Sequence, residues 1–353
     1  MSFSQYQDQD SAVQSADRIP WDPNCSIFPS RKDLPHIPGA PKDAAWVWGE
    51  NDQIGRLNLL TPTRVKDAAS SEIKTGQMIR LDLPLGVPNP PAFGRAGFVH
   101  KIKPLQEKLI YDDLYESLNT QSGTQWDGFR HFSHLSSGMF YNRTTATDIT
   151  GSTPTLNNSI HHWSATHGGI AGRCLLLDFY TYAQTHVLPY DPYQGSAISF
   201  TDSQACGYSQ GINILPVSQG GDIPVGTILM IRSGFVARYN QMSPENGADI
   251  LRNETTEYAA LKQEAAMLDW LHNCYFAALG GDAPAFERWP PQEEYFLHEY
   301  LLALWGMPIG EMWDLERVVA LCRLLGRWTF FMTCAPANVE GGVSSQANAI
   351  AIS

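Results

Sequence analysis

The sequence Gln121-Ser-Gly-Thr-Gln-Trp-Asp-Gly-Phe-Arg-His-Phe-Ser-His134 brings one carboxylate, Asp127, and two imidazoles, His131 and His134, close together in the chain. A flexible Ser-Gly-Thr turn precedes them. Carboxylates and imidazoles bind divalent cations, and an imidazole beside such a cation can move protons during hydrolysis. Asp127 and His131 are expected on a loop that turns into a helix, where their spacing of four lets both face one point. The stretch therefore predicts a metal-dependent catalytic site.

Aromatic residues alternate with the polar groups of this stretch. Trp126 and Phe129 lie beside Asp127 and His131, and with His134 they are the predicted contacts of a flat, apolar substrate. An Asp-x-x-x-His pair is also typical of a capping aspartate and a hydrogen-bonded histidine, and aromatic residues also fill cores. The apolar neighbours favour the functional interpretation, because polar groups in an apolar setting need partners.

A second pair of candidate ligands lies near the end of the chain. The sequence Leu297-His-Glu-Tyr-Leu-Leu-Ala-Leu-Trp-Gly-Met-Pro-Ile-Gly-Glu311 predicts an amphipathic helix that ends at Gly306, followed by a strand-like return. His298 near the start of the helix and Glu311 after the return are expected to reach the same end of this element. A first-turn histidine and an exposed glutamate are the alternative interpretation.

Composition narrows the class of protein. The chain has 353 residues, with 24 Lys and Arg against 36 Asp and Glu and a formal charge of −12. Nucleic-acid partners and anionic membranes are disfavoured, because both need a basic face. The first ten residues are polar and lack the apolar region of a signal peptide, so none is expected. The six cysteines form no CxxC pair and are expected to be buried thiols. We therefore expect a cytoplasmic protein with a small-molecule substrate.

The chain divides into an irregular N-terminal arm, residues 1–44, and one α/β domain with long loops, residues 45–353. The arm is rich in Asp, Gln, Ser and Pro and is expected to lie over the domain or over a neighbouring subunit. Hydrophobic periodicity in the domain predicts short buried strands and amphipathic helices. Helices are expected at residues 62–74, 258–272, 299–305 and 314–325, and strands at residues 77–83, 170–179, 227–233, 275–279, 328–333 and 347–353.

The chain resembles the cyclase family of metal-dependent hydrolases, which includes bacterial kynurenine formamidase and isatin hydrolase. The family motif His-x-Gly-Thr-His-x-Asp-x-Pro-x-His aligns with residues 121–131, and a later His and Glu align with His298 and Glu311. Residues 48–60, 169–173, 226–234 and 279–287 also agree in order, so the similarity runs from about residue 45 to the C-terminus. The Arg-His-Phe-Ser-His version of the motif and the long inserts are more similar to fungal members.

The resemblance implies a swivelling β/β/α fold in a homodimer or homotetramer, with a site partly closed by a neighbouring subunit. By position, Asp127, His298 and Glu311 would be ligands of a divalent ion, Mn²⁺ or Zn²⁺. His131, the last histidine of the motif, would be the acid/base. Such an ion activates water and polarises a carbonyl while the histidine passes a proton to the leaving group.

Gln121 and Gln125 stand where the family has two ligand histidines. An amide oxygen is a neutral and weaker donor than an imidazole nitrogen, especially toward zinc. In one arrangement Asp127, His298 and Glu311 hold the ion, and a glutamine or the last histidine of the opening stretch completes the site. In a second, one harder ion such as Mn²⁺ or Mg²⁺ replaces zinc. In a third there is no ion, and the Asp/His cluster does other work.

The predicted function is hydrolysis or ring opening of a cyclic or aromatic amide or ester. A metal-independent lyase, cyclase or dehydratase of secondary metabolism that uses His131 and Asp127 is the alternative among enzymes. A binding protein that kept the fold and lost turnover is the alternative from another class. The sequence contains no dinucleotide-binding glycine motif and no Gly-x-Ser-x-Gly elbow, so nucleotide binding and serine hydrolysis are disfavoured.

Overall fold

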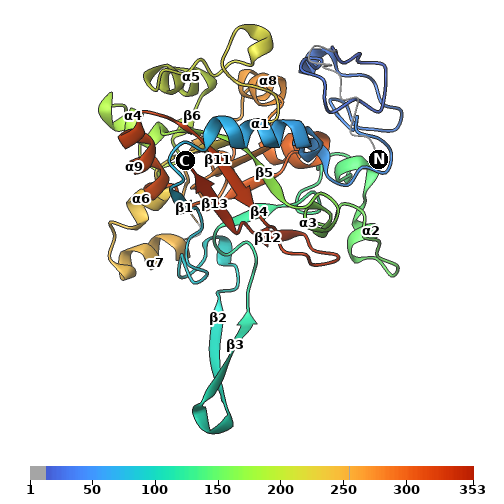
Figure 1. Cartoon of the computed structure of the whole chain (residues 1–353). Helices are drawn as coiled ribbons and strands as arrows, with labels where there is room; N and C mark the ends of the chain where they lie inside the picture. The colour runs from blue at the N-terminus through green and yellow to red at the C-terminus, as the bar shows by residue number, and fades with distance from the viewer. Residues whose placement is uncertain (1–12, 254) are drawn as a thin grey trace, which may run out of the picture.

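A mixed nine-stranded sheet forms the centre of the protein within residues 13–253 and 255–353, the part that this computed structural model describes (Figure 1). The strand order is β1-β13-β11-β5-β7-β9-β10-β4-β12. The strands of this sheet are β1 (Met78–Arg80), β4 (Gln125–Asp127), β5 (Ile170–Leu177), β7 (Ile228–Ile231), β9 (Ala278–Gly281), β10 (Ile309–Glu311), β11 (Thr329–Cys334), β12 (Ser344–Gln346) and β13 (Ala349–Ile352).

The middle of the sheet is parallel and its margins are antiparallel. Strands β5, β7, β9 and β10 run parallel to one another, whereas β11, β13 and β1 on one side and β4 and β12 on the other are antiparallel to their neighbours. All four residues of β7 and of β9 are buried, which is typical of parallel strands covered on both faces. The middle of the sheet is therefore covered on both faces and supports the residues at the ends of its strands.

Helices cover the sheet, and α1 lies across the face nearest the viewer in Figure 1. Thr61 caps α1 by accepting a hydrogen bond from the backbone N–H of Arg64, and a proline occupies the first turn. The helices are α1 (Pro62–Glu72), α2 (Ala146–Thr150), α3 (His161–Ala165), α4 (Phe179–Thr185), α5 (Phe200–Ser209), α6 (Phe235–Tyr239), α7 (Pro244–Arg252), α8 (Ala265–Asn273), α9 (Glu316–Leu325) and the π-helical η7 (Glu299–Leu304). No helix in the described ranges is long and apolar enough to cross a membrane.

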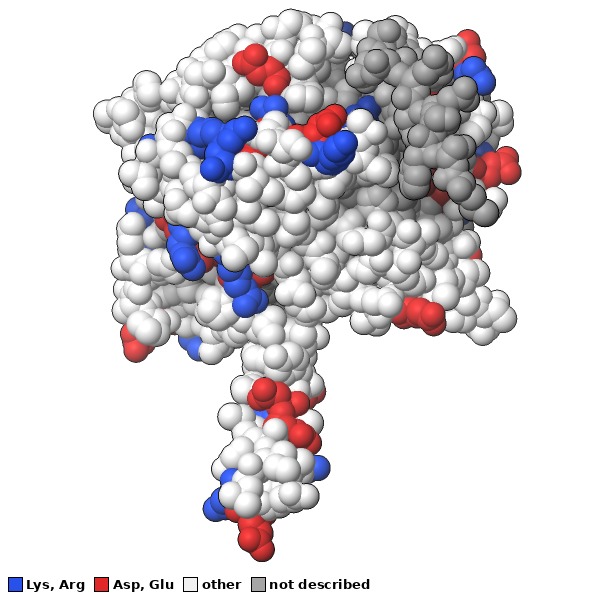
Figure 2. All heavy atoms as spheres, in the orientation of Figure 1, with Lys and Arg blue, Asp and Glu red and all other residues white. Residues whose placement is uncertain are grey.

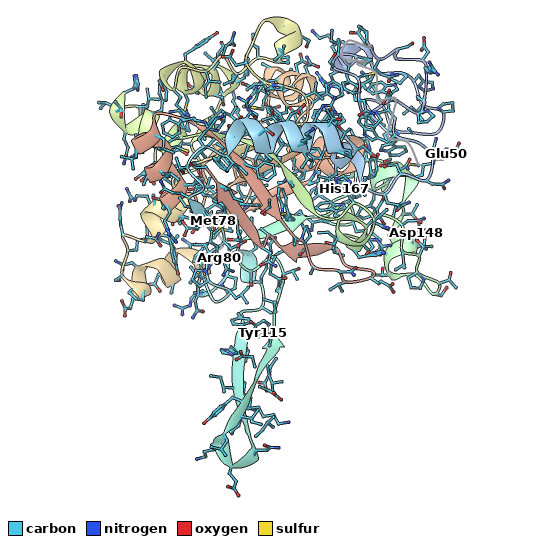
Figure 3. All side chains as sticks on the ribbon, in the orientation of Figure 1. Glu50, Met78, Arg80, Tyr115, Asp148 and His167 are labelled. Atoms are coloured by element: carbon cyan, nitrogen blue, oxygen red, sulfur yellow. The ribbon has the colours of Figure 1, made fainter. Side chains whose placement is uncertain are left out.

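A two-stranded hairpin of β2 (Val99–Leu105) and β3 (Ile110–Ser117) projects from the body as a long arm (Figure 1). Tyr115 lies on this arm, outside the body (Figure 3). Apolar side chains on the arm are exposed, with 58% of Ile102, 57% of Tyr111 and 59% of Tyr115 accessible. Basic and acidic groups occur together on it (Figure 2). The arm thus carries apolar groups that no other described residue of the chain covers.

Most of the expected elements are confirmed with shorter bounds. The helix expected at residues 258–272 is wrong in its first half, where Ala260–Leu261 forms β8, paired with β6 (Ala197–Ile198). Backbone bonds between Tyr258 and Trp289 hold this half extended, and α8 begins only after Glu264. The strand expected at residues 275–279 begins at Ala278 instead. Tertiary pairing here overrides a helical apolar spacing.

The described part of the N-terminal arm, residues 13–44, packs on its own chain. Trp21 is buried against the aromatic rings of Phe28 and Trp48. Arg31 forms an ion pair of 2.7 Å with Asp269 of α8. The part of the arm before residue 13 lies outside the described residues.

Candidate metal centre

The register of β4 against β10 places three polar side chains on one face of the sheet. Gln125 and Asp127 are two residues apart on β4, so their side chains share a face, and Gln125 lies directly opposite Glu311 of β10. All three are buried. Between Ile309 and Glu311 only glycine fits, because a Cβ at Gly310 would lie 2.3 Å from the indole nitrogen of Trp313.

His298 completes the cluster from the start of η7. One ligand atom from each of Asp127, His298 and Glu311 lies within 4.8 Å of the others. The imidazole Nε2 of His298 is 3.2 Å from Oε1 of Glu311. His298 and Glu311, which were expected at the same end of one element, thus lie close to Asp127. Glu311 belongs to β10 and Asp127 to the neighbouring strand β4.

Glu287 orients His298 and was missed by the sequence analysis as a site residue. Its carboxylate accepts hydrogen bonds from His298 Nδ1 at 2.7 Å and from the backbone N–H groups of Leu297 and His298. Gln263 Nε2 donates to it at 2.6 Å. A carboxylate that holds Nδ1 of a histidine leaves Nε2 facing the site, as in many metal centres. In the sequence, Glu287 was visible only as the last residue of the stretch 279–287, which agrees with the family.

The same contacts control the charge of His298. Burial lowers the pKa of this imidazole, but hydrogen bonds and charges from Glu287 and Glu311 outweigh burial and raise the pKa to about 10. The ring therefore carries a proton at neutral pH when no cation is bound. A cation that binds at Nε2 must displace that proton.

His131 lies beside Asp127 at the more open side of the cluster. Asp127 is in β4 rather than on the expected loop before a helix, and the chain turns directly after it, with the His131 N–H donating to the Gly128 carbonyl. The turn brings His131 Nε2 to 3.9 Å from Asp127 Oδ2, and 23% of the His131 side chain is accessible. A buried ligand candidate and a reachable imidazole are therefore adjacent.

The two glutamines meet the carboxylates through their amide groups. Gln121 Nε2 donates to Asp127 Oδ1 at 2.7 Å and lies 3.1 and 3.2 Å from the ring nitrogens of His131. Gln125 Nε2 donates to Glu311 Oε2 at 2.8 Å. Both glutamines therefore lie at the cluster, where the alignment with the family motif placed them.

Two buried oxygen atoms at the cluster fit a cation. Asp127 Oδ2 and Gln125 Oε1 have no hydrogen-bond partner among the described residues, although an unpaired buried oxygen costs free energy. Asp127, Glu287 and Glu311 supply three buried carboxylates, and within the described chain their only ion-pair partners are His131 and His298. The donor set and the excess of negative charge therefore suit a divalent ion held mainly by oxygen.

The structure shows the surroundings of the three residues predicted to contact substrate. Trp126 points to the other face of β4, is fully buried and packs against Trp313. Phe129 is fully buried against Trp163. His134 belongs to a turn in which its Nδ1 lies 2.9 Å from the Ser137 hydroxyl. Trp126 and Phe129 offer no surface to a ligand, because strand alternation and the core enclose them.

Another set of aromatic rings borders the cluster. Phe132 lies 5.3 Å from the ring of His298 and 5.2 Å from Phe296, and the row continues to Trp289 and Phe93. The rings of Phe132, Phe296, Trp289 and Phe93 are partly accessible. They come from three separate loops, so neighbouring positions in the sequence gave no sign of the row.

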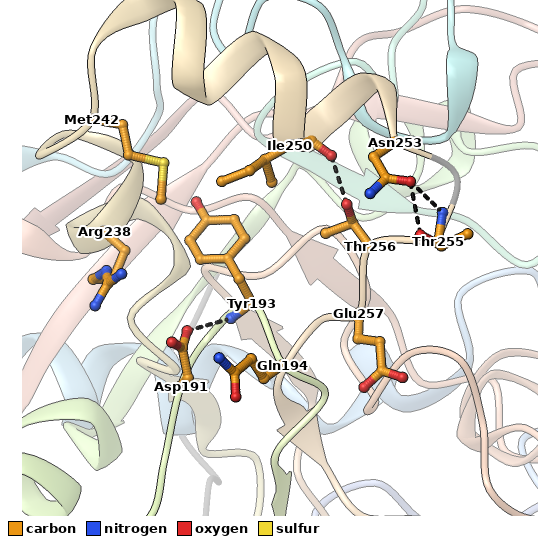
Figure 4. A pocket seen from close by; sticks show the side chains of 10 residues that line it. All are labelled: Asp191, Tyr193, Gln194, Arg238, Met242, Ile250, Asn253, Thr255, Thr256 and Glu257. Carbon is orange, nitrogen blue, oxygen red and sulfur yellow. Dashed lines mark hydrogen bonds between the residues drawn. The ribbon is translucent and has the colours of Figure 1, made fainter.

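A separate hollow of about 470 Å³ lies between α6, α7 and the loop before β6 (Figure 4). Asp191, Arg238 and Glu257 are the charged groups that line it. The Tyr193 backbone N–H donates to Asp191, as Figure 4 shows. None of its lining residues belongs to the cluster around Asp127.

The curled mixed sheet, with its carboxylate and imidazole cluster on β4 and β10, defines an α/β protein with a candidate metal centre. Comparison with known families identifies it more closely. A family model described as putative cyclase matches residues 77–288, and the chain belongs to this cyclase family. The expected α/β fold of the cyclase type, the swivelling β/β/α fold, is confirmed by the solved structures that follow.

Three solved structures have a similar fold. One, described as a novel cyclase, has a TM-score of 0.74 at 26% identity and covers 88% of this chain and 99% of that chain. Isatin hydrolase A from Ralstonia solanacearum has a TM-score of 0.52 at 17% identity, with 82% and 97% covered. Isatin hydrolase A from Labrenzia aggregata, bound to benzyl benzoate, has a TM-score of 0.51 at 15% identity, with 81% and 96% covered. No curated protein sequence matches the chain.

Proposed function

We propose that this protein is a metal-dependent hydrolase that cleaves or opens a cyclic or aromatic amide or ester. The observation that carries the proposal is the convergence of Asp127, His298 and Glu311, whose ligand atoms lie within 4.8 Å of one another. Asp127 Oδ2 is buried there without a hydrogen-bond partner among the described residues. A buried carboxylate in this state is stabilised by a cation.

Asp127, Glu311 and His298 Nε2 would hold the ion, with Gln125 Oε1 as a neutral oxygen donor. This set has more oxygen than nitrogen donors, which favours Mn²⁺ over Zn²⁺. A divalent ion bound there supplies a water of lowered pKa and an electrophile for a carbonyl oxygen. Glu287 keeps His298 in the orientation that offers Nε2 to the site.

His131 is the proposed acid/base. Its Nε2 lies 3.9 Å from Asp127 Oδ2 and its side chain is reachable from outside. In this position the imidazole can take a proton from the attacking water and give it to the leaving nitrogen or oxygen. The leaving group must therefore be placed on the His131 side of the cluster.

The row from Phe132 to Phe93 supports a planar substrate. Aromatic rings favour stacked or edge contacts with another flat ring, and Phe132 reaches the His298 imidazole directly. Isatin hydrolase A, which shares the fold, is named for isatin, so isatin is a suitable first probe of a cyclic amide.

We also propose that the protein forms a homodimer or homotetramer. The β2–β3 arm supports this, because an isolated two-stranded hairpin is marginally stable in water. Its exposed Ile102, Tyr111 and Tyr115 would be covered by a second copy.

One observation favours a metal-independent lyase as the second candidate. The amide nitrogens of Gln121 and Gln125 already bind Asp127 Oδ1 and Glu311 Oε2, so part of the carboxylate charge is stabilised without an ion. In that case His131 and Asp127 would carry the chemistry.

Metal analysis of protein purified without chelator tests the two candidates. We expect one equivalent of a divalent ion after incubation with Mn²⁺, loss of binding in Asp127→Asn, and metal-dependent turnover within a panel of isatin, aryl formamides and aryl lactones. The exposed Asp249→Asn is the matched control and should bind normally. Absence of a bound ion with Mn²⁺, Zn²⁺ and Mg²⁺ alike would overturn the proposal, and turnover without any ion would support the lyase.

A further inference from the structure

We infer that Gln121 is a positioning residue that joins the candidate ligand Asp127 to the imidazole of His131, and that it is not itself a metal ligand. The effect of Gln121 on catalysis rests on the proposed function, whereas its role in positioning Asp127 and His131 rests on the geometry alone. The amide nitrogen of Gln121 lies 2.7 Å from Asp127 Oδ1 and within 3.1 and 3.2 Å of the two His131 ring nitrogens.

The chemistry of the neighbours decides which end of the Gln121 amide faces them. An ionised carboxylate only accepts hydrogen bonds, so it requires the NH₂ group and repels the amide oxygen. A second N–H of the same group is available to a ring nitrogen of His131. The amide oxygen, the only atom with which Gln121 could bind a cation, therefore points away from Asp127.

The same contact decides which oxygen of Asp127 is free. Oδ1 receives Gln121 Nε2 at 2.7 Å and Gln125 Nε2 at 3.5 Å. Oδ2 has no hydrogen-bond partner among the described residues and faces His131 Nε2 at 3.9 Å. Gln121 thus turns the carboxylate so that its unpaired oxygen and the imidazole face the same space.

The backbone of Gln121 is held from both sides, which fixes the position from which its side chain starts. Its N–H donates to the side chain of Asn119 at 2.9 Å, and its carbonyl accepts from Arg95 Nη1 at 2.7 Å. The Arg95 guanidinium lies 5.2 Å over the ring of Phe93.

The decisive experiment compares Gln121→Met with Gln125→Met by ¹⁵N-histidine NMR of the metal-free protein. Methionine preserves length and removes the donor. We expect Gln121→Met to shift the His131 ring nitrogen signals and change its tautomer population. Gln125→Met should leave them unchanged, because the Gln125 amide bonds mainly Glu311, at 2.8 Å, and reaches Asp127 Oδ1 only at 3.5 Å. Unchanged His131 signals in Gln121→Met would overturn the inference, because the proposed contact between Gln121 and His131 exists without metal.

Kinetics give the second readout. In the Mn²⁺-loaded protein, Gln121→Met should lower kcat by about 10- to 100-fold with KM unchanged, because Gln121 positions the groups that transfer protons and does not bind substrate. An unchanged kcat, or a loss confined to KM, would contradict the positioning role. If wild-type protein binds no metal and turns over nothing, the proposed function fails, whereas the NMR comparison still decides the role of Gln121.

Discussion

Gln125 and Glu311 face each other across β4 and β10, with the amide nitrogen of one 2.8 Å from a carboxylate oxygen of the other. The register of the two strands forces this pairing, because directly opposed residues share a face. The amide stabilises one oxygen of Glu311, while Gln125 Oε1 stays without a partner among the described residues. The Gln125 side chain thus supports the candidate ligand Glu311 through its nitrogen and offers a weak ligand atom, Oε1, of its own.

Gln125→His is expected to change the preferred metal. An imidazole at this position adds a nitrogen donor to a set dominated by oxygen, which favours Zn²⁺ over Mn²⁺. Competitive binding of the two ions, followed by calorimetry, measures the shift, with Gln125→Met as the control that removes the amide without adding a ligand. Equal Zn²⁺ preference in both variants would show that residue 125 does not reach the ion.

Glu287→Gln is expected to weaken metal binding by about 10- to 100-fold while leaving the fold intact. The neutral amide still fills the space but no longer holds His298 Nδ1 as a charged acceptor does. Gln263→Met removes only one donor to Glu287 and should have a smaller effect. Titration with Mn²⁺ checks the prediction, and wild-type affinity in Glu287→Gln would argue against His298 as a ligand.

Replacing residues 100–116 with a short Gly-Ser link is expected to lower the oligomeric state without unfolding the body. The arm is exposed along its length, so its removal opens no core. Light scattering gives the mass, and melting temperature reports on the body. The milder Ile102→Thr and Tyr115→Thr changes on one face of the arm should weaken association about tenfold or more if that face is covered by a partner. An unchanged mass after the replacement would mean that the arm is not the interface.

His272 should make the protein less stable in acid. Burial, and then the charge of Arg56, lowers the pKa of this imidazole well below its ordinary 6.5. Below pH 6.5 the unfolded chain binds a proton that the folded chain does not, so this contribution to stability is present above that pH and is lost as pH falls, by about 1.4 kcal/mol per unit.

Urea unfolding at pH 7 and pH 5.5 tests this sign. His272→Phe keeps an aromatic ring beside Trp305 and Tyr275 and should lose less stability between the two pH values than wild type does. His36→Phe is the control, because His36 is exposed. An equal loss in wild type and His272→Phe would contradict the prediction.

The sequence predicted α1 and the buried strands well, because capping residues and short apolar runs act locally. Thr61 with the following proline marked the start of α1, and the apolar run from Ile228 to Ile231 is β7. Prediction from the sequence failed where a segment pairs with residues that are remote in the chain. Residues 258–272 have helical apolar spacing, yet the backbone of the first part of this segment pairs with β6 and with Trp289.

The sequence by itself determined the family, the identity of the candidate ligands and the presence of glutamine at two motif positions, since all of these depend on residue type and order. Only the tertiary structure decided how these groups meet. Strand register put Gln125 opposite Glu311, strand alternation sent Trp126 into the core, and loop packing brought Glu287 to His298. Those relationships join residues of different elements, and the distance of 2.7 Å between Glu287 and His298 is a property of packing that spacing along the sequence does not contain.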